Sequence, residues 1–139
     1  MSFNDVSRAR QMFFQSLYQM QMTKLSLKDI AQEFKEENKD KKYDREYLSD
    51  LFSNYSSYSE QIDALLDKIL KNNSCEQISP VELSVCRLGV YELLFKAETP
   101  YKVVITEALK IQQKYGVEEG YRLVNGILDQ ASKMIRSND

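Results

Sequence analysis

The sequence contains no histidine and only two cysteines. Without histidine, the chain lacks the most common general base, the most common metal ligand and every imidazole-dependent catalytic triad. Cys75 and Cys86 are too few for a disulfide framework and do not have zinc-site spacing. Cys86 falls on an apolar face and is expected in the core, and Cys75 falls in a polar stretch. Since glycine-rich phosphate loops and Gly-x-Ser-x-Gly turns are also missing, we expect no enzyme, no catalytic residue, no metal and no cofactor.

Glycine and proline are scarce, with four and two copies in 139 residues. This scarcity leaves little material for β-turns and favours helices. No apolar run approaches the roughly 20 residues of a membrane span. The N-terminus, with three charged residues among its first ten, lacks the apolar stretch of a signal peptide. The length fits one domain, and we expect an all-α protein of the cytoplasm that has no contact with a membrane.

The charge balance is slightly acidic, with a net charge of −2 and an isoelectric point near 5.3. Affinity for nucleic acid comes largely from neutralising phosphates and releasing counterions, which an acidic protein does poorly. If the chain binds RNA, it should therefore do so from a local basic patch or together with a basic partner.

Apolar residues recur at the three- and four-residue spacing of a buried helical face. The clearest helix start is Ser79-Pro80, because serine can cap free N–H groups, proline suits the first helical position and Glu82 completes a capping box. Serines at positions 53, 56, 57 and 59 weaken the third helix and predict a kink or break, so we expect six or seven helices. The first expected helix runs from residue 4 or 7 to about 21, and the second begins at 26 and has its apolar stripe as far as 34. The others cover about residues 44–71, 79–95, 99–116 and 118–136.

Two polar segments separate these helices. The charged run at residues 36–42 is expected to be a solvated loop. The polar residues 72–74 give the best boundary between two helical subdomains, an N-terminal half of about residues 1–72 and a C-terminal half of about residues 78–136.

Several polar residues interrupt the apolar patterns. Arg8 and Arg10 lie near a helix start and are either solvated charges or phosphate contacts. Arg87, inside an apolar helix, needs an acidic partner or a group of carbonyls, and a structural ion pair is favoured over a binding role. Asn125-Gly126 indicates close approach of a neighbouring helix, because glycine weakens a helix interior, and Asn125 would then be buried and need partners.

Four motifs occur in order along the chain. They are Ala-Arg-x-x-x-Phe-Gln-Ser-Leu-Tyr at residues 9–18, Pro-Val-Glu-Leu-Ser-Val-Cys-Arg at 80–87, Pro-Tyr-Lys-Val-Val-Ile-Thr-Glu-Ala at 100–108 and Val-Asn-Gly-Ile-Leu-Asp at 124–129. Each motif alone is weak, but their order and separations together resemble the NusB family of bacterial transcription antitermination factors.

This resemblance implies an all-helical fold of two small subdomains and a role in transcription. NusB-like proteins bind the boxA element of nascent RNA as a heterodimer with NusE, which is also a small-subunit ribosomal protein. The pair helps to assemble RNA polymerase antitermination complexes that suppress premature termination, notably in ribosomal RNA operons. An acidic chain suits such a basic partner through charge complementarity.

The resemblance also assigns residues. It implies RNA binding by Arg8, Arg10, Glu119, Arg122 and Leu123, contact with NusE by Tyr18 and Glu82, and structural roles for Asn125 and Gly126.

The chain departs from the family pattern at several positions. Val6 and Ser7 stand where family members usually have arginines, and Leu83 stands where a basic residue is common. Thr106 replaces an asparagine, and Leu123 replaces an aromatic residue. The fewer positive charges weaken the expectation of RNA binding by this chain alone and affect recruitment of NusE less.

Two other interpretations stay open. One is an RNA-binding accessory domain of the type fused to RNA cytosine methyltransferases, which the short chain disfavours. The other is a helical adaptor that keeps the fold but has reduced RNA binding. The tyrosine- and methionine-rich first helix could also support a homodimer of the free protein, as in some family members.

Overall fold

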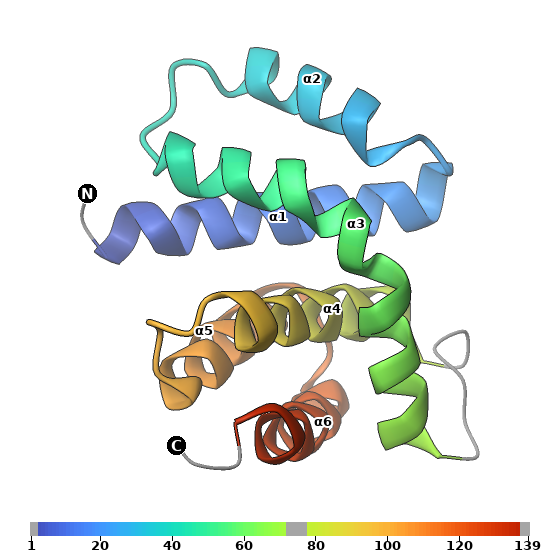
Figure 1. The fold of residues 1–139 in the computed structure, drawn as a ribbon. Helices are drawn as coiled ribbons and strands as arrows, with labels where there is room; N and C mark the ends of the chain where they lie inside the picture. The colour runs from blue at the N-terminus through green and yellow to red at the C-terminus, as the bar shows by residue number, and fades with distance from the viewer. Residues whose placement is uncertain (1–2, 72–77, 137–139) are drawn as a thin grey trace. The chain divides into compact units, whose positions relative to one another are not determined.

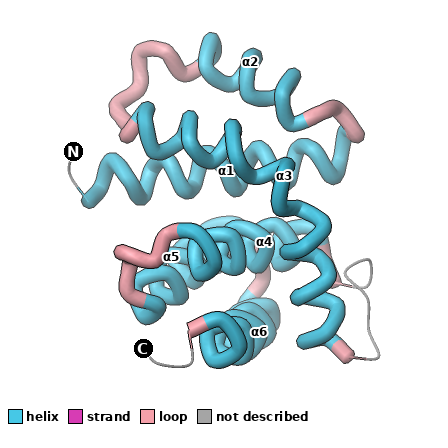
Figure 2. The backbone as a smooth tube through the Cα atoms, in the orientation of Figure 1, coloured by secondary structure: helices cyan, strands magenta, loops and turns pink. Residues whose placement is uncertain are grey.

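The computed structural model describes residues 3–71 and 78–136, and every regular element in these residues is a helix (Figures 1 and 2). The all-α prediction is therefore confirmed. Cys75 and the polar residues 72–74 lie outside the described residues. No helix of the described segments combines the length and the hydropathy needed to cross a lipid bilayer. The helices are α1 (Phe3–Thr23), α2 (Leu27–Glu37), α3 (Arg45–Leu70), α4 (Pro80–Phe95), α5 (Tyr101–Tyr115) and α6 (Glu118–Ile135).

Three helix starts have side-chain caps, and one of them is the cap that the sequence predicted at Ser79. Ser26, Asp44 and Ser79 each accept a hydrogen bond from the backbone N–H three residues later, at 3.1, 3.0 and 3.4 Å. Pro80 occupies the first turn of α4, where its missing N–H leaves no bond unmade. These caps fix where α2, α3 and α4 begin, because they satisfy donors that have no partner inside the helix.

The chain divides into two compact units, the first ending at Ser57 and the second beginning at Tyr58. The first unit contains α1, α2 and the beginning of α3. Its core includes Phe13, whose ring meets the rings of Phe52 and Tyr55 edge-on, with centroids 5.2 and 5.4 Å apart. The helix α3 continues through the serine-rich stretch without interruption, so no seventh helix arises among the described residues.

The second unit contains the end of α3 together with α4, α5 and α6, and these last three helices pack against one another (Figure 1). The helix α4 is buried on nearly all sides, in keeping with its largely apolar sequence. The end of α3 belongs to this unit because its side chains meet α4: the Tyr58 and Phe95 rings are 4.1 Å apart between centroids. The division consequently falls inside α3, whereas the sequence favoured the polar residues 72–74.

The carboxyl end of α4 is capped by an arginine from the far end of the chain. The Arg136 guanidinium donates to the carbonyl oxygens of Leu93 at 3.0 Å, Lys96 at 2.8 Å and Glu92 at 3.2 Å, and also to that of Thr99. The last carbonyls of a helix have no partner within it, and a cation there complements the helix dipole. Arg136 therefore ties the end of α6 to the end of α4.

Candidate nucleic-acid interface

A groove between the end of α3 and the exposed face of α6 contains two of the residues assigned to RNA. This α3–α6 groove has a volume of about 530 Å³, and Arg122 and Leu123 are among its lining residues. Lys68 and Lys71 line it as well, and the described residues that form the groove include no carboxylate. Leu123 is 40% exposed, so the groove combines an accessible apolar side chain with three cationic residues. Such a surface suits a polyanion that also carries flat apolar groups.

Gly126 also lines this groove, and its position corrects the expectation of a helix contact. A methyl group at Gly126 would meet no atom within 4 Å, and both Gly126 and Asn125 are exposed. The buried stripe of α6 runs through Val124, Ile127 and Leu128, which leaves positions 125 and 126 outside it. The packing role predicted for Asn125-Gly126 is therefore wrong.

The close helix contact occurs instead at Gly89 of α4. A methyl group at Gly89 would lie 2.7 Å from Cδ2 and 2.9 Å from Cδ1 of Leu128, a fully buried residue of α6. Carbon atoms normally approach to about 3.5–4.0 Å. Gly89 thus allows α4 and α6 to pack at a distance that alanine would not permit without movement of Leu128.

The two arginines of α1 differ sharply in exposure. The Arg8 side chain is 54% exposed, and its guanidinium lies 3.5 Å from the Asp5 carboxylate and donates to the Lys42 carbonyl at 3.3 Å. Arg10 is only 3% exposed, and its guanidinium carbon lies 5.4 Å from the centroid of the Tyr47 ring. Arg8 is available to a phosphate. The assignment of Arg10 to RNA is corrected, because a guanidinium buried in the protein is not exposed to the phosphates of an RNA strand.

The two residues assigned to NusE also differ. Tyr18 is half-buried on α1, with its ring 6.5 Å from that of Phe14. Glu82 is 7% exposed, and its Oε2 accepts a hydrogen bond from Gln112 Nε2 at 3.2 Å. The Glu82 carboxylate therefore turns toward α5 instead of completing the predicted capping box, and its burial corrects the expectation that it lies on a partner surface.

Gln112 is the centre of a tight polar cluster that the sequence analysis missed. Its Nε2 donates to Glu82 and to the Val117 carbonyl at 3.3 Å, and its side chain is fully buried. Methyl groups at Gly116 and Gly120 would lie 2.1 and 2.4 Å from this nitrogen, so both glycines are needed to seat the amide. The signal was present: Gln112 follows Val104 and Ala108 at four-residue spacing, a polar residue on an apolar stripe.

This cluster forms one wall of a second cavity at the junction of α5 and α6. The α5–α6 cavity has a volume of about 830 Å³ and is lined by Gln112, Glu119 and Arg122 among others. Glu119 and Arg122 are both exposed near the beginning of α6. Of the three α6 residues assigned to RNA, Glu119 lines the α5–α6 cavity and Leu123 lines the α3–α6 groove. Arg122 lines both.

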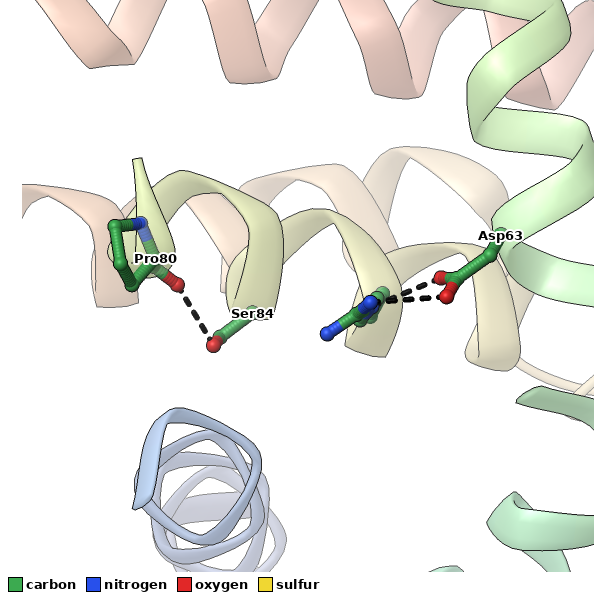
Figure 3. Close-up of polar contacts among 4 residues, drawn as sticks. Asp63, Pro80 and Ser84 are labelled. Atoms are coloured by element: carbon green, nitrogen blue, oxygen red, sulfur yellow. Dashed lines mark hydrogen bonds and ion pairs between the residues drawn. The ribbon is translucent and has the colours of Figure 1, made fainter. Parts of the chain in front are cut away.

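Arg87 has the acidic partner that the sequence required. Its Nε and one terminal nitrogen donate to the two oxygens of Asp63 at 2.8 and 2.9 Å, which joins α4 to α3 (Figure 3). Nearby, the Ser84 hydroxyl donates to the Pro80 carbonyl at 2.8 Å, so this buried polar group is also satisfied. The prediction of a structural ion pair at Arg87 is confirmed.

These features define a small all-helical protein whose candidate site is suited to binding a polyanion. Among the described residues, no group of three or more cysteines, aspartates and glutamates is arranged to hold a metal ion.

Comparison with known proteins then gives the family. The model of the NusB family matches residues 7–133, and the chain belongs to that family. The transcription antitermination protein NusB of Shewanella amazonensis is 37% identical over 122 residues, which cover 88% of this chain and 90% of the relative. The corresponding protein of Marinobacter nauticus is 38% identical over 132 residues, or 95% of this chain and 83% of the relative. The resemblance drawn from the four motifs is confirmed.

Solved structures agree with this assignment. T. maritima NusB matches with a TM-score of 0.82 and 33% identity, covering 91% of this chain and 89% of that one. A chain from the crystal structure of antitermination factors NusB and NusE in complex with double-stranded RNA matches with a TM-score of 0.85 and 27% identity. That match covers 96% of this chain and 99% of the other.

Proposed function

We propose that this chain is a transcription antitermination factor that binds boxA RNA as a heterodimer with NusE. It acts by binding, without catalysis, and helps RNA polymerase complexes to pass premature termination signals, notably in ribosomal RNA operons. Membership of the NusB family is the observation that carries this proposal. Because bacterial transcription takes place in the cytoplasm, the proposal also locates the protein there.

The α3–α6 groove supports the RNA part of this proposal. Lys68, Lys71 and Arg122 supply positive charge to one face of a protein whose net charge is −2. Local concentration of charge matters here, because each phosphate that is neutralised releases counterions. Leu123 offers an apolar surface to an unstacked base.

Gly126 adds a second argument for the groove. A glycine in a helix interior costs about 1 kcal/mol relative to alanine. At Gly89 that cost is offset by close packing against α6, but at Gly126 no neighbour lies within 4 Å. A ligand that approaches the α6 backbone closely would account for this residue.

The acidic balance of the chain supports the heterodimer. A basic ribosomal protein complements it electrostatically and adds the positive charge that this chain lacks. Of the two residues assigned to the NusE surface, Tyr18 is the one with an accessible side chain, and we propose it as a contact. On the RNA side we propose Arg8, Glu119, Arg122 and Leu123.

A test of the groove compares Arg122→Ala with Lys133→Ala, which removes the same charge from α6 outside the groove. RNA affinity of the heterodimer with NusE is measured by fluorescence anisotropy over a range of salt concentrations. For Arg122→Ala the slope of log affinity against log salt should fall by about 0.7, the value for one phosphate contact on a single strand. Lys133→Ala should leave it unchanged. Equal slopes for both variants would contradict an RNA path through the groove.

The burial of Arg10 gives the adaptor interpretation a specific basis, because it removes one more cation from the proposed RNA surface. An adaptor would bind NusE with normal affinity and would give the heterodimer no gain in RNA affinity. The salt series distinguishes the two functions, since only an RNA-binding heterodimer gives an RNA affinity whose slope against salt can be measured.

A further inference from the structure

A third hollow lies inside the first compact unit, between the end of α2 and the beginning of α3. This α2–α3 pocket has a volume of about 300 Å³, and the described residues that form it include Lys35, Lys39 and Arg45 but no carboxylate. Tyr43 and Ser49 line it as well and carry hydroxyl groups. Three cations around one hollow repel one another, and they do so in a chain whose net charge is −2. The pocket is therefore suited to an anion.

Arg45 is held in place by the loop that joins the two helices. Its Nη2 donates to the carbonyl oxygens of Lys39 at 2.7 Å and Lys41 at 3.1 Å. Its guanidinium carbon lies 4.4 Å from the centroid of the buried Tyr43 ring. These contacts engage Nη2 and one face of the guanidinium, which leaves the N–H groups of Nε and Nη1 for a ligand. A guanidinium that is already fixed loses little conformational freedom when an anion binds.

The position of Arg45 at the beginning of α3 supports the same inference. Arg45 is the first residue of that helix, where the helix dipole places a positive partial charge and a cation is unfavourable. An anion in the pocket would complement both the guanidinium and the helix end. Lys35 differs, because it lies in the last turn of α2, where a cation already complements the dipole. The alternative is that Arg45 only holds the loop, which would give the pocket no affinity for an anion.

The charges of the pocket favour phosphate over other anions. The Lys39 Nζ lies 3.3 Å from a carboxylate oxygen of Glu36, and this exposed pair offsets part of one of the three positive charges. The charge that remains matches a terminal phosphate, which carries about −1.5 to −2 at pH 7, better than a carboxylate or a phosphodiester with a single charge. A terminal phosphate also offers three acceptor oxygens to the ammonium and guanidinium donors.

We propose that the α2–α3 pocket binds a phosphate dianion, either inorganic phosphate or the terminal phosphate of a small molecule such as a nucleotide. An N–H of Arg45 donates to one phosphate oxygen, and the ammonium groups of Lys35 and Lys39 neutralise the remaining charge. All of these groups belong to the first compact unit, and none of them lines the α3–α6 groove. The site therefore does not depend on the proposed RNA-binding function.

The test titrates the ¹⁵N-labelled chain, without NusE or RNA, with inorganic phosphate at constant ionic strength and follows the backbone amide resonances. Saturable shifts should concentrate at residues 35–49. Lys35→Gln removes an exposed charge that lines the pocket and should weaken binding about threefold to tenfold. Lys28→Gln, its matched control on α2, removes an exposed charge outside the pocket and should leave the affinity unchanged. Shifts that never saturate, or equal affinities for the two variants, would overturn the proposal.

Two further probes identify the form of the phosphate. Uridine monophosphate carries a terminal phosphate, and the dinucleotide UpU without terminal phosphates carries only a diester. A higher affinity for uridine monophosphate than for inorganic phosphate would assign the pocket to a nucleotide-like ligand, and the opposite order would assign it to free phosphate. Binding of UpU at least as tight as that of uridine monophosphate would overturn the choice of a dianion and indicate contact with the backbone of a nucleic-acid strand.

Discussion

The two glycines at positions 89 and 126 make opposite predictions for the same substitution. Both lie inside helices of the second compact unit, and replacement by alanine should gain about 1 kcal/mol of helix propensity at each. At Gly126 nothing opposes this gain, because the new methyl group meets no atom within 4 Å. Gly126→Ala should therefore raise the free energy of unfolding by up to about 1 kcal/mol.

At Gly89 the gain competes with a clash. The new methyl group would lie 2.7 and 2.9 Å from the two terminal carbons of Leu128, which is fully buried, so this side chain would have to move within the core. Overpacking a core of this kind costs about 1–3 kcal/mol. After the propensity gain is subtracted, Gly89→Ala should be neutral to about 2 kcal/mol destabilising.

The difference between the two variants isolates the packing. Propensity is common to both, so Gly89→Ala should be about 1–3 kcal/mol less stable than Gly126→Ala. Urea unfolding followed by circular dichroism measures both free energies, with the wild-type chain as reference. Equal stabilities for the two variants would refute the argument that Gly89, and not Gly126, lies at a helix contact.

Three further predictions concern arginines. Arg87→Met should lower the free energy of unfolding by about 1–2 kcal/mol, because it removes a bidentate ion pair that is partly exposed. A double-mutant cycle with Asp63→Asn should give a coupling free energy of about 1 kcal/mol, and zero coupling would show that the pair contributes nothing to stability. Arg136→Met should lower the free energy of unfolding by about 2 kcal/mol, since four carbonyls lose a donor. It should also speed amide hydrogen exchange at the end of α4, and unchanged exchange would argue against this cap. Arg10→Met should lower the melting temperature and leave the salt slope of RNA binding unchanged, because Arg10 is buried. Arg8→Ala should reduce that slope by about 0.7 without loss of stability, because the Arg8 side chain is exposed. The reverse pattern would contradict the exposures of the two residues.

Local signals predicted the helices well. Ser79 and Pro80 set the start of α4 through the backbone, and a serine oxygen three residues before a free N–H needs no distant partner to act. The ion pair of Arg87 was also foreseeable, because a charge inside an apolar helix must find a partner. The identity of that partner, Asp63 on another helix, depends on packing and was not.

The candidate site was harder to predict because exposure is set by neighbouring helices. Arg10 and Glu82 were assigned to surfaces by the family motifs, yet both are buried by contacts with other segments. Gly126 could have been placed correctly, since the stripe through Val124, Ile127 and Leu128 leaves it on the outer face. The hollows next to α6 depend on which helix ends meet there, which no single segment encodes.

The gain in RNA affinity on adding NusE tests the central claim most directly. A fluorescent boxA RNA and a scrambled RNA of equal length are titrated with this chain alone and with its cognate NusE, and anisotropy reports binding. We predict weak binding of either RNA by the chain alone, in keeping with its net charge of −2, and tight binding of boxA only when NusE is present. Formation of the NusE complex with no gain in affinity for boxA over the scrambled RNA would contradict the account and indicate an adaptor that keeps the fold without binding RNA.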